Sequence, residues 1–154
     1  MLCETIDQFA ASLPKNQRLL GLDIGEKRIG LALSDYTRNI GTPHSTMVRQ
    51  GKKKDIALLK GMVEEFEVAG FVLGLPKHMN GSEGESCEMV RRFAGHLGKA
   101  LKLPIFLQDE RLSTAAVNRA MLEADMNRKK RAGLDDQLAA SYILQSALDA
   151  LKHL

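Results

Sequence analysis

The chain has 154 residues, of which 44% are hydrophobic and 27% are charged, and this size and composition suit one globular domain with a substantial core. The net charge of +3 is compatible with a nucleic-acid partner without requiring one. Two cysteines are too few for a disulfide framework, no apolar run approaches the roughly 20 residues of a membrane span, and no secretory signal opens the sequence. We therefore expect a single cytoplasmic domain over residues 1–154, with no membrane contact.

The first part of the chain predicts a short helix and then three consecutive strands. Residues 5–13 carry apolar side chains at helical spacing. Two apolar runs, 18–24 and 28–34, are separated by a tight turn and predict an antiparallel hairpin. Residues 41–49 predict a third strand, although Pro43 is unfavourable inside a sheet.

The middle of the chain alternates helices with buried strands. Apolar residues recur at helical spacing over 53–68, and 70–76 is the short continuous apolar run that is typical of a fully buried strand. Ser82 and Glu85 fit a capping box that would open the next helix. A further buried strand, 103–110, ends on carboxylates.

The last third of the chain predicts two helices. The first is capped by Ser113 or Thr114 and runs to about 124. The segment "NRKKRAG" interrupts the pattern, and the final helix covers about 134–152. Three meandering strands followed by strands that helices connect indicate an α/β fold, with a mixed five-stranded sheet and helices on both faces.

Acidic residues mark three separate elements of this fold. Asp23 lies near the end of the first strand, Glu110 follows the last strand, and Asp136 lies at the start of the final helix. Because ligands in such sheets bind beyond the carboxyl ends of the strands, we expect these three acids to converge at one rim. Three carboxylates in one place require cations, above all Mg²⁺ or Mn²⁺. A pair of such ions is the usual apparatus for hydrolysis of phosphodiesters.

Each acid also has a simpler explanation. Asp135 and Asp136 stand where any helix favours an acid. A salt bridge to Lys27 or Arg28 would account for Asp23. The turn in "DIGEKRIG" is also typical of the phosphate loop of actin-like ATPases. Those ATPases enclose the nucleotide between two such domains, whereas 154 residues supply one.

Four segments of the chain carry a family resemblance, in this order: "GLDIGEKRIGLALSD", "VLGLPKHMNGSEG", "DERLSTAAV" and "LDDQLAASYILQSALD". Together they resemble the signature blocks of the YqgF (RuvX) family over about residues 18–151. The first 17 residues lie outside the resemblance, as an N-terminal extension. The resemblance implies an RNase H-like fold and a nuclease that processes precursor 16S rRNA, in a family once described as Holliday-junction resolvases.

The resemblance also implies roles for individual residues. The family's metal-binding acids match Asp23, Glu110 and Asp136, which would hold Mg²⁺ or Mn²⁺. The block Asp-x-x-Ala-Ala selects Asp136, because Ala139 and Ala140 follow at the required spacing. Asp135 stands beside it as an added ligand or a helix cap.

Candidate substrate-binding residues surround these acids. Lys27 and Arg28 could hold a phosphate or pair with Asp23, and Arg111, which follows Glu110 directly, could take either role. Asn80 and Ser82 precede a helix whose N-terminal amides suit an anion, although a plain capped loop explains them almost as well. A basic tract could clamp a phosphate backbone or form a solvated loop. This tract consists of Arg128, Lys129, Lys130 and Arg131.

The expected partner is structured RNA. Aromatic residues make up 5% of the chain and tryptophan is absent, which argues against base stacking and favours recognition of backbone and shape. By resemblance, the expected reaction is trimming of the 5′ end of precursor 16S rRNA. One alternative is resolution of branched DNA, which would require a homodimer with two active sites. Another is a non-catalytic RNA-binding assembly factor.

Overall fold

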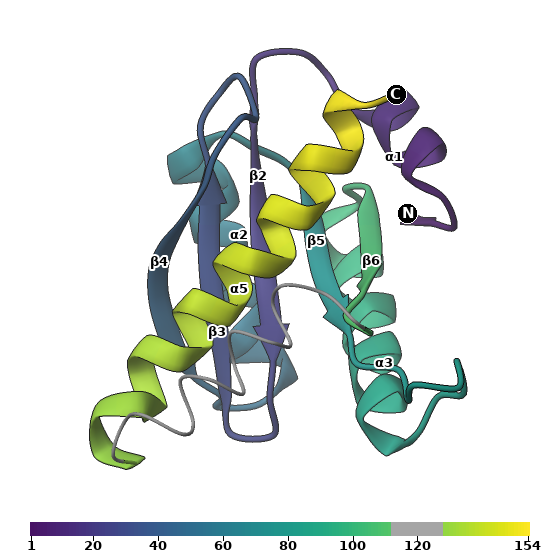
Figure 1. Ribbon diagram of the computed structural model, residues 1–154. Coiled ribbons are helices and arrows are strands. Elements are labelled where there is room, and N and C mark those ends of the chain that lie inside the picture. The colour runs from purple at the N-terminus through teal and green to yellow at the C-terminus, as the bar shows by residue number, and fades with distance from the viewer. Residues whose placement is uncertain (112–127) are drawn as a thin grey trace.

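The computed structural model describes residues 1–111 and 128–154, and over 128–135 it describes the backbone alone. A mixed sheet forms its middle layer (Figure 1), in the strand order β1-β6-β5-β2-β3-β4. The antiparallel hairpin expected at the start of the meander is confirmed, and β5, β6 and β1 run parallel to β2. The strands are β1 (Leu2–Cys3), β2 (Arg18–Ile24), β3 (Arg28–Ser34), β4 (Gly41–Val48), β5 (Val68–Leu75) and β6 (Ile105–Asp109).

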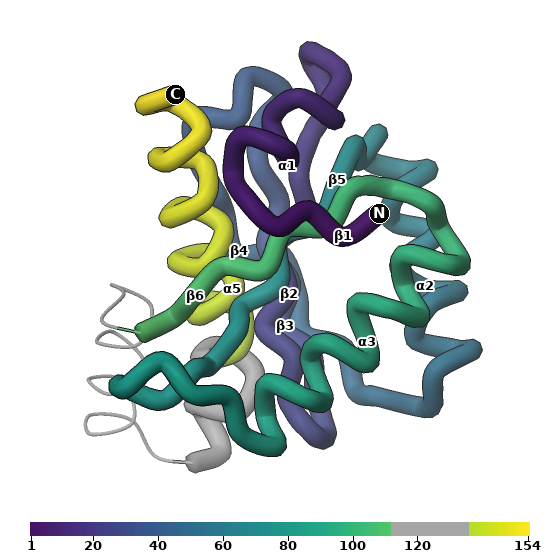
Figure 2. The backbone as a smooth tube through the Cα atoms, turned by 90° about the vertical axis from the view of Figure 1, so that its right-hand side faces the viewer, coloured from purple at the N-terminus to yellow at the C-terminus, as the bar shows by residue number. Residues whose placement is uncertain are grey.

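Helices cover both faces of the sheet, as the sequence predicts. Figure 2 shows the strands between α5 on one side and the pair α2 and α3 on the other. The short helix α1 packs on the α5 side, where Phe9 joins the core beneath α5. No helix of the described residues is both long and apolar enough to cross a membrane. The helices are α1 (Ile6–Ser12), α2 (Lys52–Phe66), α3 (Glu85–Leu101) and α5 (Arg128–Lys152).

The central strand β2 divides its side chains between two cores. Leu20 and Leu22 pack toward α2 and α3, whereas Leu19 packs toward α5. Gly21 lies on the α5 side, since a Cβ there would approach the Cβ of Leu144 to 2.7 Å. Because side chains alternate along a strand, Asp23 is placed on the same α5 side, two residues further along.

Over the described residues the sheet has six strands, not the five that the sequence predicts. The sixth is β1, in which Leu2 and Cys3 pair in parallel with Ile105 and Phe106. The amide of Ile105 donates to the carbonyl of Met1 at 2.7 Å. The N-terminal extension therefore closes one edge of the sheet, with only two residues in the strand, too few to show an alternating pattern.

Two helix starts also differ from the sequence-based expectation. Helix α3 begins at Glu85 with Gly84 as its N-cap, and the Ser82 hydroxyl donates to Asn80 Oδ1 at 2.7 Å instead of capping the helix. Helix α5 begins at Arg128, so the tract 128–131 is helical and does not interrupt the pattern. Asp136 thus lies inside α5, not at its N-terminus, and the cap explanation for this acid is wrong.

The helix expected from Ser113 or Thr114 to about 124 lies outside the described residues.

The strands β2, β3 and β4 of the meander match their expected positions closely. Pro43 is accommodated because β4 is an edge strand and the pairing register shifts between Leu31 and Ala32.

We predict that Asp35→Asn lowers the free energy of unfolding by about 1 kcal/mol at pH 7. Asp35 Oδ1 accepts from the amides of Asn39 and Ile40 at 2.8 and 2.9 Å, and Thr37 donates to Oδ2. Burial alone raises the pKa of Asp35, but these bonds outweigh it and bring the pKa to about 2. The folded-state pKa is depressed, so this stabilisation is present above pH 4 or so and is lost as the pH falls toward 2. Urea denaturation at pH 7 and pH 3 measures it, and an equal deficit of the variant at both pH values would contradict the prediction.

Candidate active site

Asp23 occupies the central strand between two glycines. In the β2–β3 pair it lies directly opposite Gly30. On its other side β2 pairs with β5 up to Leu22 and Leu73, so Gly74 is the next residue of β5 beside Asp23. Neither neighbour has a side chain, and this leaves room on the α5 side of the sheet around the Asp23 carboxylate.

Glu110 uses the space above Gly74. It follows β6 directly, is 6% exposed, and its amide donates to the Leu75 carbonyl at 3.1 Å. A Cβ built on Gly74 would lie 2.8 Å from Glu110 Oε2. The Glu110 carboxylate therefore rests on the strand next to Asp23, where any larger residue at position 74 would displace it.

Asp136 uses the space above Gly30 in the same way. Helix α5 crosses β3 so closely that a Cβ on Gly30 would lie 1.9 Å from the carbonyl oxygen of Asp136. The Asp136 side chain is 24% exposed and accepts from Arg28 Nε at 2.8 Å. Arg28 therefore pairs with Asp136, whereas the sequence suggested Asp23 as its partner.

The topology thus brings Asp23, Glu110 and Asp136 to one face of the sheet. They lie near the carboxyl ends of the parallel strands β2, β5 and β6, beside the β2–β3 hairpin. Among the described residues, no three His, Cys, Asp or Glu side chains stand close enough together to hold a metal ion as they are. The Asp136 carboxylate is bonded to Arg28. Gly30 and Gly74 were not among the predicted site residues. The signal that could have identified them is a glycine inside a buried strand, which often marks a close approach of other groups.

A hollow of about 310 Å³ lies beside this region, at the hairpin turn. Lys27, Arg28 and Asp136 line it together with Gly25 and Glu26. Two of the predicted phosphate-binding cations therefore border Asp136. The hollow is open enough to admit a phosphate group, and it combines both signs of charge.

The turn of the β2–β3 hairpin is anchored by Arg49, which forms an ion pair with the buried Asp55. Arg49 donates to the Gly25 carbonyl at 2.9 Å, and its amide donates to the Lys27 carbonyl at 2.9 Å. Its guanidinium also lies 3.6 Å from Asp55, which is 1% exposed. Since a buried carboxylate is costly without a partner, this pair fixes the backbone that presents Lys27 and Arg28.

Arg111 pairs with Asp109 and reaches the loop before α3. Its Nη2 lies 2.9 Å from Asp109 Oδ2. Burial alone raises the pKa of Asp109, but hydrogen bonds from the side chain and amide of Arg111 outweigh it and lower the pKa. Gly81 has φ of +90°, and a Cβ there would lie 2.9 Å from Arg111 Nη1. The structure therefore brings Arg111 next to the loop that carries Asn80 and Ser82.

The remaining predicted residues are placed less fully. Asn80 accepts from the Ser82 amide at 3.0 Å as well as from its hydroxyl, so the two side chains stabilise their own loop. The side chains of Arg128, Lys129, Lys130, Arg131 and Asp135 lie outside the described residues.

If Glu110 acts from its place above Gly74, Gly74→Ala should lower RNA cleavage by about 10- to 100-fold with the fold retained. The added methyl group meets the ends of two flexible side chains, Ile143 Cδ1 at 2.5 Å and Glu110 Oε2 at 2.8 Å. Both can rotate away, so the main result is a displaced carboxylate. Initial rates and circular dichroism measure the two effects, and wild-type rates in a folded variant would contradict the prediction.

Comparison with known proteins shows which family and which relatives the chain is similar to. The family model described as "RuvX: Holliday junction resolvase" matches residues 17–150. The chain is 53% identical over 154 residues to the "Putative pre-16S rRNA nuclease" of Rhodobacter capsulatus, covering 100% of this chain and 97% of that protein. It is 49% identical over 154 residues to the protein of the same name in Ruegeria pomeroyi, with 100% of both covered.

Solved structures of low sequence identity share the fold. T. thermophilus RuvC in complex with a Holliday junction substrate matches with a TM-score of 0.55 at 12% identity, over 89% of this chain and 96% of that one. The yeast mitochondrial Holliday junction resolvase Ydc2 matches with a TM-score of 0.52 at 14% identity, over 96% and 86%. At these identities the likeness concerns the fold alone, and it confirms the expected RNase H-like architecture.

Proposed function

The chain belongs to the RuvX family, and from this premise we propose that it is a metal-dependent nuclease that processes the 5′ end of precursor 16S rRNA in the cytoplasm. The observation that carries the proposal is the setting of Asp23. It lies on the central strand between two glycines, and the space that these glycines leave accommodates Glu110 on one side and Asp136 on the other.

The donor atoms around Asp23 fit a hard divalent cation. Asp23, Glu110 and Asp136 offer carboxylate oxygens, which Mg²⁺ and Mn²⁺ prefer. Because Gly30 and Gly74 have no side chains, Asp136 and Glu110 can lie close to the sheet beside Asp23, as a shared ion would require. Asp136 would exchange its bond to Arg28 for the ion. When bound, Mg²⁺ or Mn²⁺ supplies activation of water and stabilisation of the leaving oxygen.

The neighbouring cations of the chain would position the substrate. Arg28 offers a planar fork of donors that matches a phosphate, and it is already next to Asp136. Lys27 lines the same hollow. On the other side, Arg111 presents a guanidinium next to the loop that carries Asn80 and Ser82. We propose that these groups, with the 128–131 tract, hold the RNA backbone on either side of the scissile phosphate.

Junction resolution is the second candidate, because the fold resembles that of resolvases with branched-DNA substrates. Symmetric cleavage of a junction requires two active sites related by a twofold axis. A stable homodimer that cuts four-way DNA in preference to RNA would favour this alternative.

Metal removal tests the proposal directly. We expect purified protein to cleave a structured RNA that contains the precursor 5′ end in Mg²⁺ or Mn²⁺, and to lose about 100-fold or more of its rate in EDTA. Cleavage should return when the ion is restored, and a four-way DNA junction should be cut poorly. Cleavage that persists in EDTA would refute metal dependence. Tight binding without cleavage under any condition would indicate an assembly factor.

A further inference from the structure

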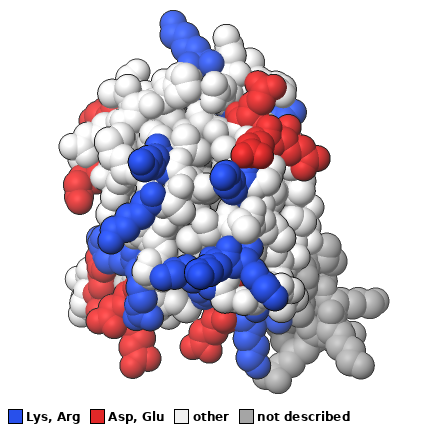
Figure 3. Space-filling view, turned by 180° about the vertical axis from the view of Figure 1, so that it is seen from behind, with Lys and Arg blue, Asp and Glu red and all other residues white. Residues whose placement is uncertain are grey.

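The face of the sheet opposite α5 carries a basic groove between α2 and α3. Figure 3 looks onto this face and shows Lys and Arg side chains gathered across its middle, with most acids toward the edges. The groove has a volume of about 550 Å³. Its charged lining consists of Lys52, Lys53, Lys60 and Lys99, with His96 beside them.

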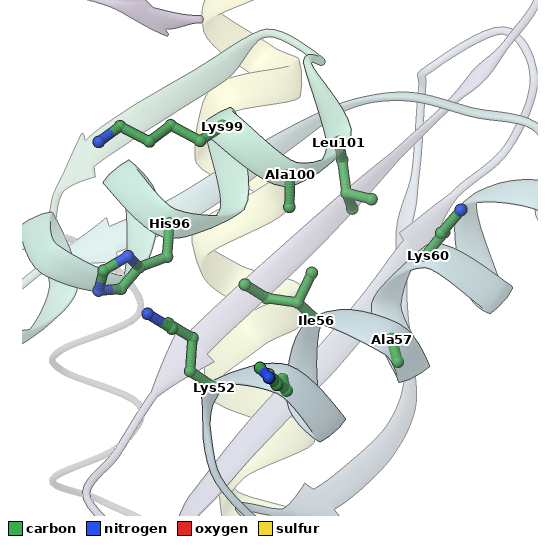
Figure 4. Close-up of a pocket in the computed structure, with 9 residues that line it drawn as sticks. Lys52, Ile56, Ala57, Lys60, His96, Lys99, Ala100 and Leu101 are labelled. Atoms are coloured by element: carbon green, nitrogen blue, oxygen red, sulfur yellow. The ribbon is translucent and has the colours of Figure 1, made fainter.

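Helical spacing explains why the charges gather there. On α2, Lys52, Lys53 and Lys60 share one side of the helix with Ile56. In Figure 4, Lys52 extends toward His96 of α3, and Ile56 points into the space between the two helices. The groove therefore has lysines on both walls and a narrow apolar floor.

These lysines are not neutralised by the described part of the protein. The four ion pairs among the described residues all involve arginines, and none includes a groove lysine. Partial burial lowers the pKa of His96, and nearby cations, including Lys52 and Lys99, lower it further. The groove thus holds a concentrated positive charge that favours an anion.

We propose that this α2–α3 groove binds the phosphate backbone of a second segment of the RNA, on the side of the sheet opposite the candidate active site. Only the identity of the polyanion rests on the proposed function. Lysines are flexible point charges that suit phosphates, and among the described residues no Phe, Tyr or Trp lines the groove for base stacking. RNA is favoured over an acidic peptide because RNA is the proposed substrate of the same protein.

The position of the groove predicts which RNA benefits from it. The whole sheet separates the groove from Asp23, Glu110 and Asp136, which lie on the α5 side. A short hairpin bound at the acids cannot reach both faces. We therefore expect the groove to contribute to the binding of a large RNA with several helices and not to the binding of a short hairpin.

Charge removal with a matched control tests the proposal. Lys52→Gln, Lys60→Gln and Lys99→Gln are combined in one full-length variant, and Lys15→Gln, Lys54→Gln and Lys152→Gln in another. All six lysines are exposed and Lys54 shares α2 with two of the groove residues. Affinity for a multi-helix RNA is measured by fluorescence anisotropy in EDTA, over a range of salt, after both variants are shown to melt like the wild type.

We expect the groove variant to bind about 10-fold or more weakly at low salt, with a log–log salt slope shallower by about 2 to 3. The control should lose less than about 3-fold. Equal losses in both variants would overturn the proposal, because the effect would then come from net charge. So would unchanged RNA binding with lost binding of a polyglutamate peptide, which would assign the groove to an acidic protein.

His96 supplies a second measurement at the site itself. A bound polyanion should raise the pKa of His96 and move its ring-proton signals, whereas the ring-proton signals of His153, beyond α5, should keep their positions. Proton NMR of the imidazole signals with and without the RNA reports both, and an unchanged His96 would overturn the proposal. RNA binding is measured in EDTA, so this measurement does not depend on cleavage. If the groove binds RNA but the RNA is not cleaved when Mg²⁺ or Mn²⁺ is present, only the proposed nuclease function is refuted.

Discussion

Replacing Asp23 with Asn is expected to lower the rate of RNA cleavage about 10³-fold or more, equivalent to ~4 kcal/mol of barrier. The change keeps the shape of the side chain and removes the negative charge at the centre of the three acids. The strand should remain intact, because Asp23 lies on the central strand between two glycines. The space beside these glycines accommodates an aspartate or an asparagine side chain. RNA affinity should be equal or tighter, since a negative charge near phosphate is lost.

The comparison requires a variant with the same charge change elsewhere. Asp149→Asn provides it, because Asp149 is an exposed acid on α5, and we expect its cleavage rate to match the wild type. Single-turnover rates and RNA affinity in Mg²⁺ measure both properties. Glu110→Gln and Asp136→Asn should behave like Asp23→Asn. Cleavage at the wild-type rate by Asp23→Asn would refute the role assigned to this acid.

Gly30→Ala is expected to lower the free energy of unfolding by about 3 kcal/mol or more. The new Cβ would lie 1.9 Å from the carbonyl oxygen of Asp136 and 2.2 Å from its carbonyl carbon. Both atoms belong to the backbone of α5, so no side-chain rotation can relieve the contact. The helix would have to move away from β3, and this would also withdraw Asp136 from the site.

Gly95→Ala is the matched control for this change. Gly95 lies in α3, and a Cβ there would meet no atom within 4 Å. Alanine is the better helix former, so this variant should be more stable by about 0.5–1 kcal/mol. Urea denaturation measures both variants. A Gly30→Ala protein as stable as the wild type would show that α5 does not pack on β3 as described.

Local patterns predict most of the sheet but not its edge. The apolar runs of β2 and β3 coincide with the structure because a continuous apolar run and a tight turn are short-range signals. The strand β1 has two residues and pairs with Ile105 and Phe106, about a hundred positions away. No pattern within so short a segment could reveal that partner. The beginning of α5 was missed because a run of cations lacks apolar periodicity.

The candidate site shows the same limit. The positions of Asp23 and Glu110 on their elements follow from sequence, whereas Asp136 was expected at the start of the final helix and lies inside α5. Topology then places the three acids on one face. The pairing of Arg28 with Asp136 joins residues 108 positions apart, and the sequence suggested the nearby Asp23 as the partner instead. The basic groove was likewise invisible, because Lys60 and Lys99 belong to two different helices and only packing brings them together.

The pairing of β1 with β6 also constrains when the sheet can be completed during translation. Leu2 and Cys3 are synthesised about a hundred residues before their partners in β6. At the usual 5–20 residues per second, this interval lasts roughly 5–20 s. In the last part of this interval, after β5 and before β6 is made, the nascent chain has an uncovered strand edge at β5, which is where contact with other chains or with a chaperone is most favoured.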